Sequence, residues 1–258
     1  MDFSEGPNMK APRGLQNFPL GPFISLFIRP FETIFLKRRD KVRKIIIFAV
    51  MVILAGVISP SAFGQSDSKV LMIIREGRSH DPDLMIKMEV GTMTVVLKKA
   101  GYRVDTASLS GQDVLGCTQK IEKLLKLSEV KLENYAGVII PCMGVPEPIA
   151  SPEMVAMIKD VLAKGKLMAA SNGAVTVLAK AGVLKGRKYA FAYRPADSAF
   201  GKYFAATDLE GAIYSGQGVV QDGNIITGGG CPRSESNGGI QNRTLELTQT
   251  FMKAIGPK

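Results

Sequence analysis

The chain has little of the chemistry on which many metal and disulfide sites depend. Its 258 residues include three cysteines, one histidine and no tryptophan. Three cysteines exclude a disulfide-dense scaffold, and a single histidine, His80, excludes a zinc site built on several imidazoles. The cysteines form no Cys-x-x-Cys pair. The sequence therefore predicts neither a bound metal nor a cofactor.

The charge is positive but unevenly placed. The formal net charge is +10, and residues 1–64 contribute half of it, with nine basic and four acidic side chains. The remaining 194 residues carry 24 basic and 19 acidic side chains, so they are only mildly basic. No basic stripe in them is interleaved with aromatic residues, which argues against nucleic acid as a partner.

Residues 45–58 form an apolar run of 14 residues that follows Arg43 and Lys44. A membrane-spanning helix needs about 20 apolar residues, whereas a shorter run after basic residues is typical of a secretory signal. Ala62-Phe63-Gly64 supplies small residues at the expected cleavage positions. We therefore expect residues 43–64 to be a signal peptide and the protein to be exported, periplasmic or extracellular. An uncleaved membrane anchor over residues 45–64 and a buried core helix are the alternatives, and residues 1–42 are interpreted as a disordered or mis-called extension.

Residues 65–258 alternate between strand-like and helix-like segments. Gly101, Gly165 and Gly182 stand where predicted helices end, and Asp222-Gly223 between two apolar runs predicts a β-hairpin. The alternation predicts an α/β domain with a mostly parallel sheet covered on both faces. The strands are expected over residues 69–75, 102–107, 136–141, 166–170, 212–215, 219–221 and 224–227, and the helices over residues 82–100, 117–127, 152–164, 172–181 and 243–255.

Ser171 follows a buried strand directly and precedes a helix. A strand that turns straight into a helix is the geometry of a nucleophile elbow, which exposes one side chain beside helix N–H groups. Ser171 is equally suited to be a plain helix N-cap. A Ser-His-Asp hydrolase in the usual chain order is excluded, because no histidine follows Ser171.

Glu89 falls within the apolar stripe of the predicted helix 82–100, on the same face as Met85 and Met93. An ionised carboxylate is costly to bury, so a glutamate in this place needs a raised pKa or a dedicated partner. If Glu89 instead lies at the edge of the stripe, its side chain reaches solvent.

Four stretches within residues 69–256 form a recognisable set: KVLMII, ENYAGVIIPCMG, AASNGAVTVLAKAGVLKGRK and VVQDGNIITGGGCP. Together they resemble the ThiJ/PfpI superfamily of class I glutamine amidotransferase-like domains. The superfamily includes PfpI-type proteases, glyoxalase-like and deglycase-like enzymes, and chaperones. The resemblance implies a flavodoxin-like three-layer sandwich with one β-hairpin, a homodimer, and a reactive cysteine on an elbow that is hydrogen-bonded to a glutamate.

The resemblance places the family glutamate at Glu89 and the reactive cysteine at Ser171. Asn172 takes the place of the histidine that often follows, and Cys142 and Gly144 lie in the turn expected to supply backbone donors. A serine hydroxyl, unlike a thiol, needs a general base to react.

The leading hypothesis is therefore an altered domain, without the elbow thiol, that binds an unknown small molecule or partner. An active hydrolase, amidase or glyoxalase/deglycase-like enzyme using Ser171 and Glu89 is the alternative. His80 is a conceivable base for Ser171. Cys142 is a conceivable second thiol, and it forms a disulfide with Cys231 if the chain brings the two close enough.

Overall fold

The computed structural model describes residues 68–75, 82–144, 151–197 and 205–256. The predicted segments 1–42 and 43–64, and His80, lie outside the described residues. In the described part of the chain, no helix is long and apolar enough to cross a membrane.

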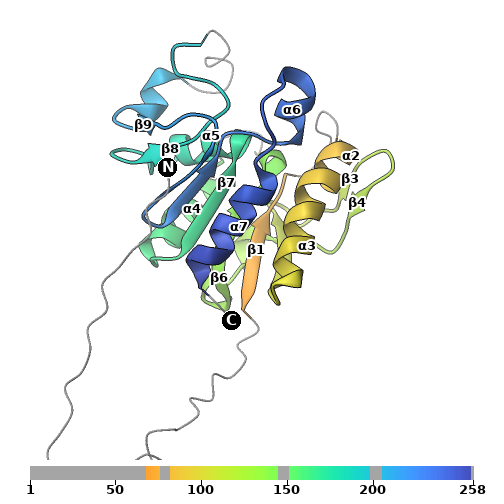
Figure 1. The fold of residues 1–258 in the computed structure, drawn as a ribbon. Helices are drawn as coiled ribbons and strands as arrows, with labels where there is room; N and C mark the ends of the chain where they lie inside the picture. The colour runs from red at the N-terminus through yellow and green to blue at the C-terminus, as the bar shows by residue number, and fades with distance from the viewer. Residues whose placement is uncertain (1–67, 76–81, 145–150, 198–204, 257–258) are drawn as a thin grey trace, which may run out of the picture. The chain divides into compact units, whose positions relative to one another are not determined.

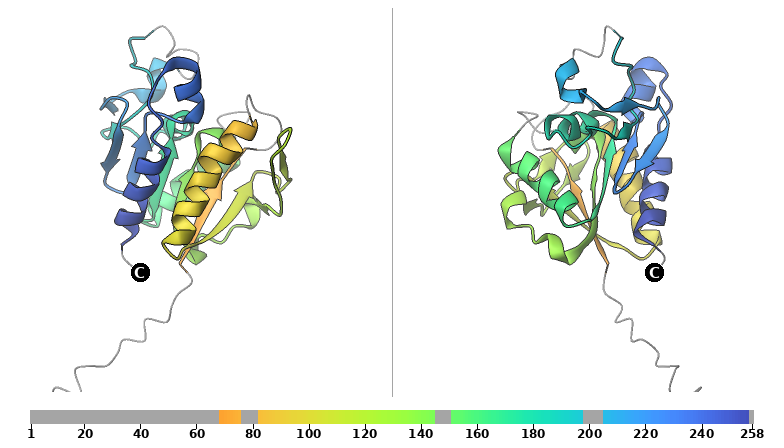
Figure 2. Two further views of the ribbon diagram at one scale, coloured as in Figure 1. Left: turned by 45° about the vertical axis from the view of Figure 1, so that its right-hand side comes forward. Right: turned by 90° about the vertical axis from the view of Figure 1, so that its left-hand side faces the viewer.

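Figures 1 and 2 show the arrangement of the helices and strands. The strands are β1 Lys69–Ile73, β2 Arg103–Ser108, β3 Val114–Leu115, β4 Lys120–Ile121, β5 Leu125–Lys126, β6 Tyr135–Ile140, β7 Leu167–Ser171, β8 Lys188–Tyr189, β9 Ile213–Tyr214, β10 Val219–Asp222 and β11 Ile225–Gly228. The α-helices are α2 Pro82–Met85, α3 Gly91–Lys99, α4 Pro152–Ala163, α5 Val175–Lys180, α6 Pro232–Gly238 and α7 Thr244–Ile255. The shorter helical turns are η1 Ile86–Val90, η2 Leu127–Glu129, η3 Leu132–Asn134, η4 Cys142–Gly144, η5 Asn172–Ala174 and η7 Ala206–Leu209.

The main sheet has seven strands in the order β10-β11-β7-β6-β1-β2-β5. All neighbouring pairs in it are parallel except β10 and β11, which form an antiparallel hairpin at one edge. This confirms the predicted flavodoxin-like sheet with one hairpin. Because β1, β6 and β7 are central and parallel, their carboxyl ends meet at one edge of the sheet, where α/β proteins place their sites.

Two hydrophobic clusters cover the two faces of the sheet. Successive strand residues point to opposite faces, so Val70 and Met72 join one cluster while Leu71 and Ile73 join the other. Helices α3 and α7 lie together over the first face, and α4 and α5 lie together over the second (Figure 2). The result is the expected three-layer sandwich.

The helix predicted over residues 82–100 is continuous but not uniform. A π-helical segment, η1, lies between α2 and α3, and it contains Glu89. A π segment shifts the side chains that follow it around the helix axis, and such segments are frequent at functional sites. The helix ends before Gly101, which has a φ of 84° as a helix-terminating glycine does.

The helix predicted over residues 117–127 is wrong. This stretch instead forms β4, which pairs with β3, and β5, which extends the main sheet beside β2. The side chain of Asp83 accepts hydrogen bonds from the backbone N–H groups of Thr118 and Gln119. This contact with a distant residue fixes the segment between β3 and β4, and such tertiary contacts override a local helical pattern.

The β-hairpin is present, with its turn shifted by one residue. Asp222 still pairs with Ile225, so Gly223 and Asn224 are the two turn residues rather than Asp222 and Gly223. Gly223 has a φ of 59°, which suits glycine in the first central position of a tight hairpin turn.

Candidate functional site

The junction between β7 and η5, at the carboxyl end of a central strand, is called the elbow here. Ser171 is the last residue of β7 and has ordinary extended backbone angles, with φ −93° and ψ 123°. Asn172 follows with a φ of 37°, in the left-handed region. The strained residue of a strand-to-helix elbow is the one that presents its side chain at the sheet edge. The expectation that Ser171 lies on the turn is therefore wrong by one residue, and Asn172 occupies the turn.

Ser171 lies behind the turn, in the interior. Its side chain is 0% exposed, and its hydroxyl Oγ lies 2.7 Å from Oε1 of Glu89, which is also 0% exposed. The structure therefore brings Glu89 and Ser171 into direct contact from two different elements, η1 and β7. Glu89 accepts two further hydrogen bonds, from the N–H of Cys142 to Oε1 at 3.0 Å and from the N–H of Met143 to Oε2 at 3.4 Å.

Burial decides the protonation of Glu89. Loss of solvent, together with the nearby sulfur of Cys231, raises the pKa of Glu89 to about 8. Hydrogen bonds from the Cys142 N–H, the Ser171 hydroxyl and the Met143 N–H act in the opposite direction without offsetting the burial. Glu89 is therefore mostly protonated at neutral pH.

Two thiols surround the side chain of Asn172. The amide nitrogen Nδ2 of Asn172 donates to Sγ of Cys231 at 3.5 Å and lies 3.9 Å from Sγ of Cys142. The N–H of Gly173 also donates to Sγ of Cys142, at 3.3 Å. The side-chain oxygen Oδ1 of Asn172 accepts a hydrogen bond from the N–H of Ala192 at 3.3 Å, which fixes the orientation of the side-chain amide. All three cysteines of the chain are free thiols.

The two sulfurs titrate in opposite directions. The pKa of Cys231 is lowered to about 6, because the thiol of Cys142 hydrogen-bonds to its sulfur and because Ser234 and Asn172 add further donors. The pKa of Cys142 is raised, since its proton is held in the bond to Cys231 and since it is desolvated. The pair therefore shares one proton at neutral pH, with the negative charge on Cys231.

The predicted residues fall into three groups. Glu89, Ser171, Asn172 and Cys142 converge at the carboxyl ends of β6 and β7, and Gly144 ends the η4 turn that begins at Cys142. His80 lies outside the described residues. The sequence interpretation gave Cys231 only a conditional disulfide with Cys142; in the structure both thiols are free, and Cys231 contacts Asn172 directly.

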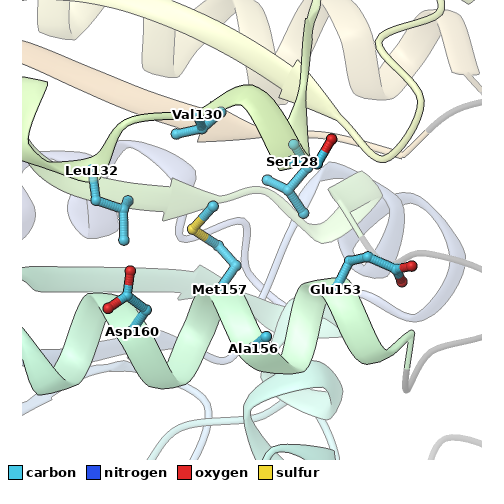
Figure 3. A pocket seen from close by; sticks show the side chains of 8 residues that line it. Ser128, Val130, Leu132, Glu153, Ala156, Met157 and Asp160 are labelled. Atoms are coloured by element: carbon cyan, nitrogen blue, oxygen red, sulfur yellow. The ribbon is translucent and has the colours of Figure 1, made fainter.

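A surface hollow of about 300 Å³ lies elsewhere, between α4 and the segment 127–132 (Figure 3). Met157 and Leu132 point into it, and Glu153 and Asp160 lie on α4 at its border (Figure 3). None of the predicted site residues lines this hollow. It has no nucleophile paired with a base among its lining residues, so the elbow is the stronger candidate site.

The elbow site has the parts for hydrogen bonding and thiol chemistry, but its turn carries no nucleophile. Asn172 is an amide, which is not nucleophilic. Ser171 is a buried alcohol whose partner is a mostly protonated acid. Beside Asn172, the group that favours its nucleophilic form at neutral pH is the sulfur of Cys231, whose pKa is lowered to about 6.

Known proteins share both the sequence pattern and the fold. The DJ-1/PfpI family pattern matches residues 69–236. An uncharacterised protein of Methanocaldococcus jannaschii is 32% identical over 164 residues, which cover 62% of this chain and 74% of that protein. Protein dj-1beta of Drosophila melanogaster is 28% identical over 148 residues, covering 56% of this chain and 75% of that protein.

Solved structures give the same answer for the fold. A ThiJ/PfpI domain protein from Brachyspira murdochii superposes with a TM-score of 0.56 at 17% identity, covering 72% of this chain and 95% of that one. The crystal structure of Drosophila melanogaster DJ-1beta gives a TM-score of 0.53 at 22% identity, covering 74% of this chain and 91% of that one. The family match spans more than half of the chain, so the chain belongs to the DJ-1/PfpI family.

Proposed function

We propose that this chain is an exported DJ-1/PfpI domain whose elbow carries no nucleophile and which binds a small molecule at the carboxyl edge of its sheet. One observation carries the proposal. The hydroxyl of Ser171 is wholly buried and is paired at 2.7 Å with Glu89, whose pKa is raised to about 8.

This pairing leaves Ser171 without activation. A serine hydroxyl reacts as a nucleophile when a neighbouring base accepts its proton during attack. At neutral pH, Glu89 is mostly protonated and already accepts N–H groups from Cys142 and Met143. The acid and the alcohol therefore stabilise one another as a structural pair, and Asn172 presents an amide at the turn.

The alternative function is an active hydrolase, amidase or glyoxalase/deglycase-like enzyme that uses Ser171 with Glu89. The short Ser171–Glu89 contact favours it, because a hydroxyl and a carboxyl at hydrogen-bond distance are the minimum for general-base catalysis. This function requires that the elbow opens enough for a substrate to reach Oγ of Ser171.

Covalent labelling separates the two functions. We expect a serine-reactive fluorophosphonate to leave the folded protein unlabelled, as measured by intact-protein mass spectrometry at pH 7 and at pH 9. The matched variant Ser171→Ala fixes the background, and circular dichroism checks that both proteins are folded. Labelling of the wild type that disappears in Ser171→Ala would establish the enzyme and end the binding proposal.

Export forms a separate part of the proposal. The order of charges, apolar run and small residues over 43–64 supports it, and both the family match and β1 begin after this segment, at residue 69. We expect N-terminal sequencing of the protein expressed in a secreting host to find a start near Gln65. A retained N-terminus would instead favour a membrane anchor over residues 45–64. The homodimer remains a prediction from the family.

A further inference from the structure

Cys142 and Cys231 come from different parts of the chain and lie beside the same side chain, that of Asn172. Cys142 begins the η4 turn after β6, and Cys231 lies between β11 and α6. Both sulfurs contact the same amide nitrogen, Nδ2 of Asn172, at 3.9 and 3.5 Å. The two thiols also interact strongly enough to shift each other's pKa, that of Cys142 upwards and that of Cys231 downwards. Two cysteines far apart in the sequence are thus brought to the same side chain.

We propose that Cys142 and Cys231 form a redox-active dithiol that reduces a hydroperoxide and closes to an intramolecular disulfide beside the elbow. The inference does not depend on the ligand-binding function, because it uses neither Ser171 nor a bound small molecule. It places thiol chemistry on two residues that flank the turn rather than on the turn itself.

The surroundings assign a role to each sulfur. Cys231 is the attacking thiolate, because the amide of Asn172 donates to its sulfur at 3.5 Å and because the neighbouring Cys142, ahead of other causes, lowers its pKa to about 6. Cys142 keeps its proton and is the resolving thiol. Glu89 is the other titratable group facing the pair, and in its protonated form it adds no negative charge that would oppose the thiolate.

The reaction balances in two steps. In the first, the Cys231 sulfur attacks one peroxide oxygen, so an S–O bond forms, the O–O bond breaks, and the alkoxide or hydroxide leaves and takes a proton from solvent. In the second, the Cys142 sulfur attacks the resulting sulfenic acid, so the S–S bond forms, the S–O bond breaks, and water leaves with the Cys142 proton. Two thiols are oxidised by two electrons, and one hydroperoxide is reduced to an alcohol or water.

Access selects a small oxidant. Cys231 is 1% exposed and Cys142 is partly exposed, so the pair is reached through Cys142's side of the site. Hydrogen peroxide is small enough to enter with a modest local opening, whereas oxidised glutathione is not. Cys117 is exposed and lies between β3 and β4, so it provides a comparison thiol within the same molecule.

Peroxide titration tests the pair. In a Cys117→Ser background, we expect hydrogen peroxide to remove two hydrogen atoms per chain, and peptide mapping to join the Cys142 and Cys231 peptides. Cys142→Ser should stop at a sulfenic acid on Cys231, which dimedone traps, and Cys231→Ser should leave Cys142 reduced. Circular dichroism shows that each variant is folded. A folded protein that forms no such disulfide would overturn the proposal.

The pH profile supplies a second and sharper readout. A pKa of about 6 raises the thiolate fraction of Cys231 at pH 7 about thirtyfold over a free thiol of pKa ~8.5. The lower intrinsic nucleophilicity of a low-pKa thiolate removes about tenfold of that gain. The rate constant alone is therefore only a few-fold higher, and the midpoint of the pH–rate profile is the better measurement.

Three variants separate the causes of that midpoint. We expect it near pH 6 in the Cys117→Ser background, still low in Cys142→Ser, whose hydroxyl can replace the thiol as donor, and higher in Cys142→Ala, which has no donor. Glu89→Gln should leave the midpoint near 6, because Glu89 titrates near 8. A midpoint near that of a free thiol in the unmodified pair would overturn the assignment of Cys231 as the thiolate.

Discussion

Two carboxylates on the first helical stretch of the chain have opposite surroundings. Asp83, in α2, is partly exposed and accepts hydrogen bonds from the Thr118 N–H and hydroxyl, both at 2.8 Å, and from the Gln119 N–H at 3.1 Å. Glu89, in the π segment that follows, is wholly buried and accepts bonds from Ser171, Cys142 and Met143.

The two groups have similar numbers of donors and opposite pKa shifts. For Asp83, some desolvation acts to raise the pKa, but the hydrogen bonds from Thr118, Gln119 and Cys117 together lower it. For Glu89, burial outweighs its hydrogen bonds, and the pKa rises to about 8. Hydrogen bonds favour the charged form of both carboxylates, but they outweigh desolvation at Asp83 and are outweighed by burial at Glu89. The helix face on which each residue falls determines the outcome.

Removing the buried carboxyl group of Glu89 should lower the free energy of unfolding more than any other change considered. Glu89→Ala leaves the N–H groups of Cys142 and Met143 and the Ser171 hydroxyl without an acceptor in the interior. A buried donor without a partner costs about 1–3 kcal/mol, so we expect the free energy of unfolding to fall by at least ~3 kcal/mol. Urea unfolding at pH 6 followed by circular dichroism measures the change.

Glu89→Gln is the matched control for this loss. The glutamine side chain has the same shape and keeps one acceptor oxygen, so most of the stability at pH 6 should return. Asp83→Ala is the second control, because water replaces the lost partner of Thr118 and Gln119. Equal losses for Glu89→Ala and Asp83→Ala would contradict the contrast between the two sites.

The pH dependence of stability should differ between the wild type and Glu89→Gln. The folded protein holds the Glu89 proton up to about pH 8, whereas the unfolded chain releases it near 4.5. Between these values the folded state binds more protons, so stability that is present below pH 4.5 is lost as pH rises towards 8. We expect the wild type to lose about 1 kcal/mol relative to Glu89→Gln between pH 5 and pH 6.

The stability comparison is restricted to pH 5–6 because, above pH 6, ionisation of Cys231 changes the stability in the opposite direction. Its folded pKa is lowered from 9.0 to about 6, so its thiolate adds stability as pH rises from 6 towards 9. Repeating the urea series in Cys231→Ser should extend the decline caused by Glu89 up to about pH 8. A flat difference between wild type and Glu89→Gln would show that Glu89 is ionised in the folded state.

The sequence predicts the buried carboxyl better than the elbow. Glu89 lies between Met85 and Met93 in the apolar stripe, and a 3.6-residue period is enough to expect it inside. Which residue ends β7 depends on pairing with β11, where Ser171 lies opposite Gly228. A shift of one residue changes which side chain lies on the turn, and local sequence gives no signal at that precision.

The contacts of Asp83 and of the Cys142–Cys231 pair could not be predicted from local sequence, because they join residues that are far apart in the chain. The segment 117–127 has helical spacing, but Asp83 contacts it from another element, and a Cβ at Gly116 would displace the Asp83 carboxylate from its position. Likewise, the strand ends place Cys142 and Cys231 at one edge of the sheet. Their shared contact with Asn172 depends on the geometry of three loops, which no single segment encodes.

The smallest expected effect comes from Asp83→Asn, which tests the surface side of the contrast. Asparagine keeps one acceptor oxygen but turns an NH₂ group towards the donors of Thr118 and Gln119, so the β3–β4 turn should loosen while the global fold persists. Hydrogen exchange read by NMR should show lost protection at the amides of Thr118 and Gln119 and unchanged protection in β1 and β6.

Because the pKa of Asp83 is lowered in the folded state, its contribution to stability is present above the unfolded value of 3.8 and is lost as pH falls through the folded pKa. The difference from wild type should therefore vanish in acid, the reverse of the direction expected for Glu89. Loss of protection that extends into the core strands would mean that Asp83 supports the sheet as well as the turn.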